Sequence, residues 1–181
     1  MKPKLLPHIC CAPCAGYLLR ELQKKFDLTA YFYNPNLDSK EEHQKRLAET
    51  EKYCQKLGID LIKDSYDHKG WLKIVKGLEN EPEGGKRCLK CFEMRLKEVA
   101  KFAKEHNFDC FSTTLTVSPY KSTKVISPIG REVARKFGVE FLDKDFGRRD
   151  GFKKSLEISK EEGFYRQGYC GCEFGRAGDR W

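Results

Sequence analysis

Short apolar runs alternate with longer amphipathic stretches along the 181 residues of this chain. The short runs are bounded by Gly, Pro, Asn or Asp, which is typical of buried strands. They predict strands at residues 5–9, 28–33, 59–63, 109–115 and 139–142. The longer stretches repeat apolar residues at helical spacing. They predict helices at residues 13–26, 40–57, 71–78, 88–106, 125–137 and 152–162.

The second of these helices has start and stop signals at its two ends. Ser39 is the expected N-cap, and Glu42 follows three residues later, which is the spacing of a capping box. Gly58 follows the last apolar position and is expected to end the helix.

The alternating order of strands and helices predicts the fold class. It indicates an α/β protein of three layers, with a mainly parallel sheet and helices on both faces. The chain has no internal repeat or linker, so we expect a single domain over residues 1–181, with an irregular tail at about 163–181. Ligands of such sheets bind beyond the carboxyl ends of the strands, and the first group of cysteines lies there.

The cellular compartment bears on how the nine cysteines are interpreted. No apolar run approaches the roughly 18 residues that cross a bilayer, and the N-terminus lacks the apolar core of a signal peptide. We therefore expect a cytoplasmic protein. In a reducing compartment, clustered cysteines are better explained as metal ligands or redox groups than as structural disulfides.

Two groups of cysteines predict a metal centre. Cys10, Cys11 and Cys14 fall at a predicted strand-to-helix turn, where the helix N-terminus favours thiolate, and Cys88 and Cys91 form a CxxC at the start of another helix. Thiolates from both groups suit zinc or an iron–sulfur cluster. The adjacent Cys10 and Cys11 fit a zinc knuckle poorly, which favours a cluster.

The other four cysteines divide into two kinds. Cys170 and Cys172 enclose Gly171, and such a CxC pair can close a small, strained disulfide of the easily reduced, catalytic kind. Two free thiols or extra metal ligands are the alternative. Cys54 and Cys110 lie on predicted core positions and are expected to be small buried residues.

Positive charge is concentrated in two segments. The formal net charge is +8; residues 86–104 hold seven Lys and Arg against two Glu, and residues 120–136 hold five against one. A localised basic surface favours a polyanion such as nucleic acid, and a solvated Lys- and Glu-rich surface is the alternative. Residues 165–169 contain Tyr, Arg and Gln, which are suited to recognising a base.

The motifs together resemble one known family over almost the whole chain. They are His8-Ile9-Cys10-Cys11-Ala12-Pro13-Cys14, Tyr33-Asn34-Pro35-Asn36, Gly77-Leu78-Glu79, Arg87-Cys88-Leu89-Lys90-Cys91-Phe92, Thr113-Thr114-Leu115 with Ser118-Pro119, and Tyr165-Arg166-Gln167 through Cys172. In this order they are similar to the cobalamin-independent epoxyqueuosine reductase family, QueH.

The resemblance implies a fold, a reaction and a set of site residues. The fold is related to the adenine-nucleotide alpha-hydrolases (HUP-like), and the reaction reduces epoxyqueuosine at the tRNA wobble position to queuosine. The implied partners are tRNA carrying epoxyqueuosine and an unidentified electron donor, with no membrane. The implied cofactor is a [4Fe-4S] cluster, and the redox-active pair is Cys170 and Cys172. The residues that match the family's cluster ligands are Cys10, Cys11, Cys88 and Cys91.

Reduction of an epoxide needs two electrons, so a second redox element is expected beside a one-electron cluster. It is either the dithiol of Cys170 and Cys172 or a second metal ion, such as iron, bound with the help of Cys14. Three other functions remain open: an iron–sulfur tRNA thiolation enzyme, a zinc-stabilised RNA-binding module and a general dithiol oxidoreductase. No Gly-rich phosphate loop follows the first strand, which argues against ATP use and therefore against thiolation.

Overall fold

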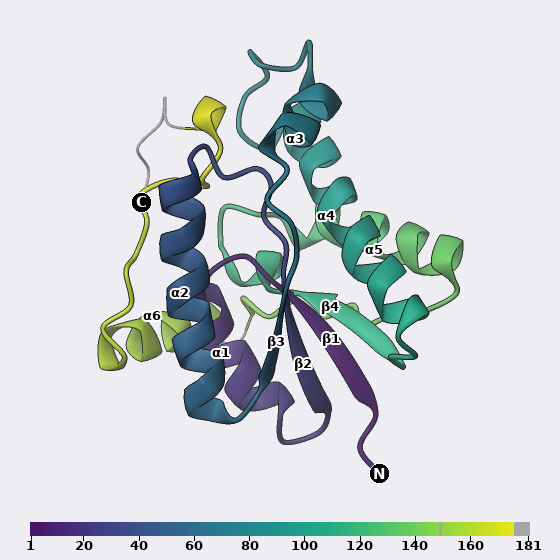
Figure 1. Ribbon diagram of the computed structural model, residues 1–181, viewed down its shortest axis with the longest axis vertical. Helices are drawn as coiled ribbons and strands as arrows, with labels where there is room; N and C mark the ends of the chain where they lie inside the picture. The colour runs from purple at the N-terminus through teal and green to yellow at the C-terminus, as the bar shows by residue number, and fades with distance from the viewer. Residues whose placement is uncertain (149, 176–181) are drawn as a thin grey trace.

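The computed structural model describes residues 1–148 and 150–175. Its centre is a five-stranded parallel sheet with the strand order β3-β2-β1-β4-β5 (Figure 1). The strands are β1 (Lys4–Ile9), β2 (Asp27–Phe32), β3 (Asp60–Lys63), β4 (Cys110–Thr113) and β5 (Glu140–Phe141). The strand order reverses between β1 and β4, which in open α/β sheets marks the crevice where ligands bind.

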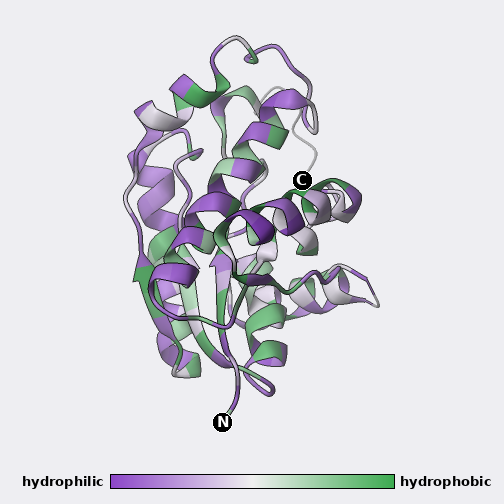
Figure 2. Cartoon of the chain, turned by 90° about the vertical axis from the view of Figure 1, so that its right-hand side faces the viewer, coloured by the Kyte–Doolittle hydropathy of each residue, from purple (hydrophilic) through white to green (hydrophobic). Residues whose placement is uncertain are grey.

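Helices cover both faces of this sheet. They are α1 (Ala12–Leu22), α2 (Lys40–Leu57), α3 (His68–Val75), α4 (Lys86–Glu105), α5 (Thr123–Phe137) and α6 (Gly151–Glu161), with 3₁₀ turns η1 (Thr114–Val117) and η2 (Glu173–Gly175). In Figure 1, α1, α2 and α6 lie on one side of the sheet and α4 and α5 on the other. Figure 2 shows hydrophilic and hydrophobic residues alternating along the helices, as expected of amphipathic helices over a sheet.

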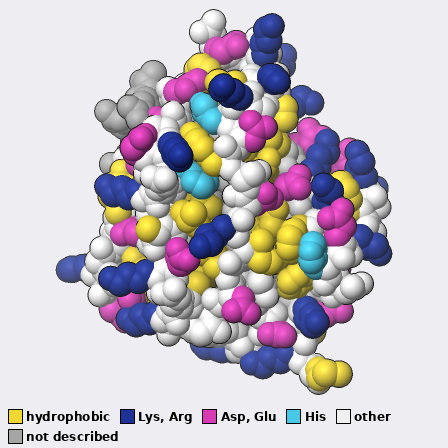
Figure 3. All heavy atoms as spheres, in the orientation of Figure 1, with side chains coloured by type: hydrophobic (Ala, Val, Ile, Leu, Met, Phe, Trp, Pro, Cys, Tyr) yellow, Lys and Arg dark blue, Asp and Glu magenta, His cyan; other side chains and the backbone are white. Residues whose placement is uncertain are grey.

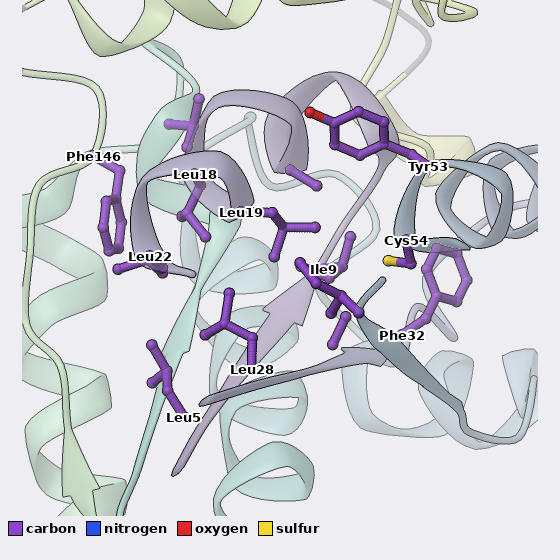
Figure 4. Packing of buried hydrophobic residues seen from close by; sticks show 14 of the residues in the cluster. Leu5, Ile9, Leu18, Leu19, Leu22, Leu28, Phe32, Tyr53, Cys54 and Phe146 are labelled. Atoms are coloured by element: carbon purple, nitrogen blue, oxygen red, sulfur yellow. The ribbon is translucent and has the colours of Figure 1, made fainter. Parts of the chain in front are cut away.

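The central strand β1 explains why the core has two halves. Leu5 and Ile9 point to the half formed with α1, α2 and α6 (Figure 4), whereas Leu6 points to the half formed with α4 and α5. All three side chains are completely buried. A parallel strand covered on both faces is apolar along most of its length, and this fixes the position of the residues that follow Ile9.

Several element ends differ from those that the periodicity predicts, and two of them have a clear local cause. Helix α1 ends four residues earlier than predicted, in a turn where the Phe26 N–H bonds the Leu22 carbonyl at 2.9 Å. Strand β4 ends at Thr113 because the Thr113 hydroxyl accepts the N–H of Leu115 at 3.2 Å and starts η1. The earlier end of β4 directs residues 114–118 across the carboxyl end of β1.

The signals at the ends of α2 are confirmed, with one change. Ser39 Oγ accepts the N–H of Glu42 at 3.1 Å, and Gly58 ends the helix with φ +66°. The Glu42 carboxylate instead accepts from Arg46 Nε at 2.7 Å. That ion pair holds the buried side chain of Arg46, which is 3 % exposed, beside the C-terminal tail.

The tail after α6 runs back along α2. The backbone N–H of Tyr165 bonds the Glu49 carboxylate, and the N–H of Asp38 bonds the Gly171 carbonyl at 2.8 Å. The part of the predicted tail at residues 176–181 lies outside the described residues. None of the described helices is both long enough and apolar enough to cross a membrane.

Candidate metal and substrate site

A pocket opens at the carboxyl ends of the strands, where ligands of parallel sheets bind. Its walls come from the β1–α1 turn, the β2–α2 loop, α2, α4, the segment after β4 and the tail. It is lined by Cys10, Cys14, Asn34, Asn36, Leu37, Arg46, Arg95, Ser118, Lys121, Gln167, Tyr169 and Cys170. The site is therefore built from segments throughout the sequence.

Three thiols meet at the first turn of α1. The sulfurs of Cys10, Cys11 and Cys14, called here the thiol trio, all lie within 4.8 Å of one another. Cys11 is the N-cap of α1 in an extended conformation, and Pro13 occupies the first turn, where its missing N–H is tolerated. This turn brings neighbouring cysteines into one cluster.

The trio shares its protons unequally. The pKa of Cys10 is lowered well below its usual value because Cys11 and Cys14 donate hydrogen bonds to its sulfur. The pKa of Cys11 is raised to about 11 by that same bond, and the pKa of Cys14 is also raised. Thr114 Oγ1 lies 3.1 Å from the Cys10 sulfur as a further donor. Cys10 is therefore the thiol of the trio that loses its proton most readily, and all three thiols would be deprotonated on binding a metal.

Buried cations face these sulfurs. Arg95 is 2 % exposed and donates to Asn34 Oδ1 at 2.5 Å and to His8 Nε2 at 3.3 Å. Burial and the charge of Arg95 lower the pKa of His8 to about 3, so its ring is neutral, and its Nε2 also lies 3.0 Å from the Tyr33 carbonyl oxygen. Burial opposes the charge of Lys121, but the nearby sulfurs of Cys170, Cys10 and Cys14 outweigh it and raise the pKa of Lys121.

The second predicted ligand pair lies at the start of α4. Cys88 and Cys91 are 8 % and 7 % exposed, and burial raises the pKa of both thiols. Cys88 belongs to the same apolar cluster as Cys10 and Cys11, whereas Cys91 packs in a neighbouring cluster. Among the described residues, the trio is the one group of three or more ligand atoms within 4.8 Å. The four-cysteine ligand set thus stays a prediction.

The CxC segment joins the same region without a disulfide. All nine cysteines are free thiols, so the predicted strained disulfide of Cys170 and Cys172 is not formed in this structure. Cys170 lines the pocket, while Cys172 is buried and packs against Cys91. Gly171 between them has φ +110°, and Arg46 Nη1 donates to the Cys170 carbonyl at 3.2 Å.

Several polar residues predicted to recognise a ligand do lie at the pocket. Gln167 Nε2 donates to the Cys11 sulfur at 3.1 Å, and the Tyr169 hydroxyl bonds Asp38 Oδ1 at 3.0 Å. Ser118 also lines the pocket. Cys54 and Cys110, the two cysteines expected in the core, are both buried.

The sequence interpretation missed the cations of this site. Arg46, Arg95 and Lys121 are ordinary members of a basic chain until the fold turns them inward. A signal was available for Arg95, which lies on the apolar face of α4 between Phe92 and Val99. A cation on the buried face of an amphipathic helix indicates a paired or functional charge.

Comparison with known proteins places the chain in a family. A profile described as "Epoxyqueuosine reductase QueH" matches residues 5–178. The chain belongs to the QueH family. Its QueH relatives include proteins from Staphylococcus epidermidis (40 % identical over 181 residues, covering 96 % of this chain and 76 % of that one), Streptococcus pyogenes (36 % over 180 residues, covering 96 % and 71 %) and Thermotoga maritima (35 % over 173 residues, covering 94 % and 88 %).

A solved structure confirms the fold class. The U34-tRNA thiolase NcsA from Methanococcus maripaludis, solved with its [4Fe-4S] cluster, superposes with a TM-score of 0.61. The match covers 96 % of this chain and 61 % of the thiolase, at 16 % identity. At that identity the likeness is one of fold, namely the HUP-like architecture expected for a QueH protein.

Proposed function

We propose that this chain reduces epoxyqueuosine at the tRNA wobble position to queuosine. The observation that carries the proposal is the thiol trio beside a cation-lined pocket in a member of the QueH family. The thiolation alternative is supported only by a likeness of fold to the thiolase. The zinc-module alternative leaves the match to a family of reductases unexplained.

We further propose that Cys10, Cys11, Cys88 and Cys91 hold a [4Fe-4S] cluster, with Cys14 available for a second metal ion such as iron. The donor set fits such a group, because it consists of free thiols and Cys10 already favours the thiolate. When bound, the cluster would supply electrons one at a time.

The chain's own residues would stabilise the charge that the reaction develops. Opening an epoxide to an alkene takes up two electrons and two protons and releases water, and negative charge grows on the epoxide oxygen as its bond breaks. Arg46, Arg95 and Lys121 line the pocket and are placed to stabilise that oxygen. Burial strengthens their effect because the surroundings screen charge less than water does.

The source of the second electron has two candidates in this chain. One is the dithiol of Cys170 and Cys172, of which Cys170 is the member that faces the pocket. The other is a metal held with Cys14. Anaerobic single-turnover reduction by Cys14→Ala and Cys172→Ala separates them, since only the variant that lacks the second redox element should stop after one electron. Full reduction by both variants would reject both candidates.

We propose that tRNA binds over α4 and α5, which pack side by side and carry the two basic segments. Figure 3 shows Lys and Arg side chains on this side of the molecule, mixed with acidic ones. Lys86, Lys90 and Lys136 line a surface groove between the two helices. Binding should weaken steeply as salt increases, and an affinity independent of salt would reject this electrostatic role.

The test of the function starts from protein purified without oxygen. The wild type should be brown, contain iron, give an electron paramagnetic resonance signal after reduction, and convert epoxyqueuosine in tRNA. Cys10→Ala and Cys88→Ala should lose iron and activity, whereas Cys54→Ala, a buried cysteine outside the site, should keep both. A colourless zinc protein that binds RNA without reducing it would overturn the proposal.

A further inference from the structure

Three buried polar atoms around the pocket have no hydrogen-bond partner among the residues that the structure describes. They are Asn36 Oδ1, Arg46 Nη2 and Gln167 Oε1. Asn36 and Arg46 are 2 % and 3 % exposed, and all three side chains line the same pocket. Roughly nine in ten buried polar groups of native proteins are bonded. Three exceptions around one pocket indicate a ligand that completes them.

Other contacts hold two of these side chains in place. Arg46 Nε is bonded to Glu42 at 2.7 Å, and its Nη1 is bonded to the Cys170 carbonyl at 3.2 Å. Gln167 Nε2 is bonded to the Cys11 sulfur at 3.1 Å. The free atoms are therefore fixed before a ligand arrives, which reduces the entropy lost on binding.

The chemistry of the free atoms limits the ligand. Two are amide oxygens, which accept hydrogen bonds and disfavour the oxygens of a phosphate or carboxylate. The third is a guanidinium N–H, which donates and, with Arg95 and Lys121 in the same wall, disfavours an ammonium group. A neutral group that both donates and accepts fits all three atoms, and a hydroxyl is the simplest such group.

We propose that Asn36, Arg46 and Gln167 form a subsite for neighbouring hydroxyl groups of the substrate, beside the reacting epoxide. Two hydroxyls donate to the amide oxygens, and one of their oxygens accepts from Arg46 Nη2. This inference rests on the proposed function, because it places the hydroxyls on the modified base. It makes the subsite, and not the basic surface, the part that distinguishes the modified tRNA from the unmodified one.

The experiment compares the Kd of two tRNAs that differ only at the wobble position, one with epoxyqueuosine and one with guanine. The Kd of the guanine tRNA divided by the Kd of the epoxyqueuosine tRNA isolates the contribution of the pocket from that of the tRNA backbone. Asn36→Leu and Gln167→Met should each lower this ratio about tenfold while leaving the guanine tRNA unchanged. Gln167→Glu keeps an acceptor oxygen but loses the donor to Cys11, so it should retain more of the ratio than Gln167→Met.

Gln55→Met, an exposed change on α2, is the matched control and should behave as the wild type. Thermal unfolding verifies that each variant is folded, and the two pocket positions lie in different segments, so loss of one variant leaves the other. An unchanged ratio in both variants, or equal weakening of both tRNAs, would overturn the subsite. Competition by inorganic phosphate would also overturn it, in favour of an anion. If the wild type fails to reduce epoxyqueuosine, the proposed function fails instead.

Discussion

Gly171 provides a sharp test of how the tail completes the site. Its φ of +110° is strained for any residue with a side chain, and a Cβ placed there would lie 2.3 Å from Leu37 Cδ2 and 3.0 Å from Arg46 Nη1. Gly171→Ala should therefore force the segment from its position on α2, because neither the backbone nor Arg46 can yield without breaking other contacts.

The size of the effect follows from the contacts that dock the tail. The backbone strain is about 2 kcal/mol, which alone shifts a docking equilibrium about 30-fold. Three hydrogen bonds hold residues 169–171, from Asp38 N–H, Arg46 and Tyr169, and each contributes about 1 kcal/mol. The backbone strain and the steric overlap together offset most of the free energy that these hydrogen bonds contribute to docking. The fold should persist, since the core lies elsewhere.

The assay is single-turnover reduction of epoxyqueuosine in tRNA, with thermal unfolding measured alongside. Gly171→Ala should reduce the rate at least tenfold and change the melting temperature by only a few degrees. Gly168→Ala is the matched control in the same segment, because its φ is not positive and nothing lies within 4 Å of its Cβ. A Gly171→Ala rate equal to that of the control would refute the reasoning.

Three further predictions concern the framework of the site. Arg87 is buried and donates to backbone carbonyls of the loop before α4, so Arg87→Met should lower the free energy of unfolding by about 2 kcal/mol in denaturant titrations, and the exposed Lys86→Met should not. Burial raises the pKa of Cys54 to about 12 and that of Cys110 to about 11. Both thiols should therefore resist alkylation by iodoacetamide at pH 8, measured by mass spectrometry, until the protein unfolds. Labelling of the folded protein at the rate of a free thiol would contradict this. A Cβ at Gly130 would lie 2.3 Å from the Phe141 ring of β5. Overpacking should outweigh the gain in helix propensity, so Gly130→Ala should destabilise the protein by about 1 kcal/mol. A rise in melting temperature would show instead that the ring moves aside.

Much of the fold could be predicted because it depends on local periodicity. The strands beside Leu5 and Phe32 and the helix after Ser39 carry strong patterns, and their existence and order are confirmed. The ends that were wrong depend on single side chains. Thr113 caps η1, and Asp67 caps α3 by accepting the Gly70 N–H at 2.8 Å, so that α3 begins earlier than predicted.

The site was only partly accessible from the sequence. Cysteine spacing predicted that thiols would gather after β1, and the trio confirms it. Cys14 was expected only as a ligand of a second metal, whereas its sulfur lies within 4.8 Å of those of Cys10 and Cys11. Arg46 could not be predicted, because it is held in the site by the tail, which is distant in the chain, as well as by Glu42 one turn earlier on α2. Arg95 did carry a signal, namely its position on the apolar face of α4. Arg87 and Arg95 also show that part of the basic charge is internal.

The tail supplies Gln167, Tyr169 and Cys170 to a pocket whose first thiols lie at Cys10 and Cys14. A ribosome adds about 5–20 residues per second, so the N-terminal thiols are synthesised roughly 8–30 s before the segment that covers them. During that interval the sulfurs are exposed to oxidation and to adventitious metal. For the metal proposed above, this order of synthesis favours late loading, after the tail has packed on α2, or protection of the thiols until then.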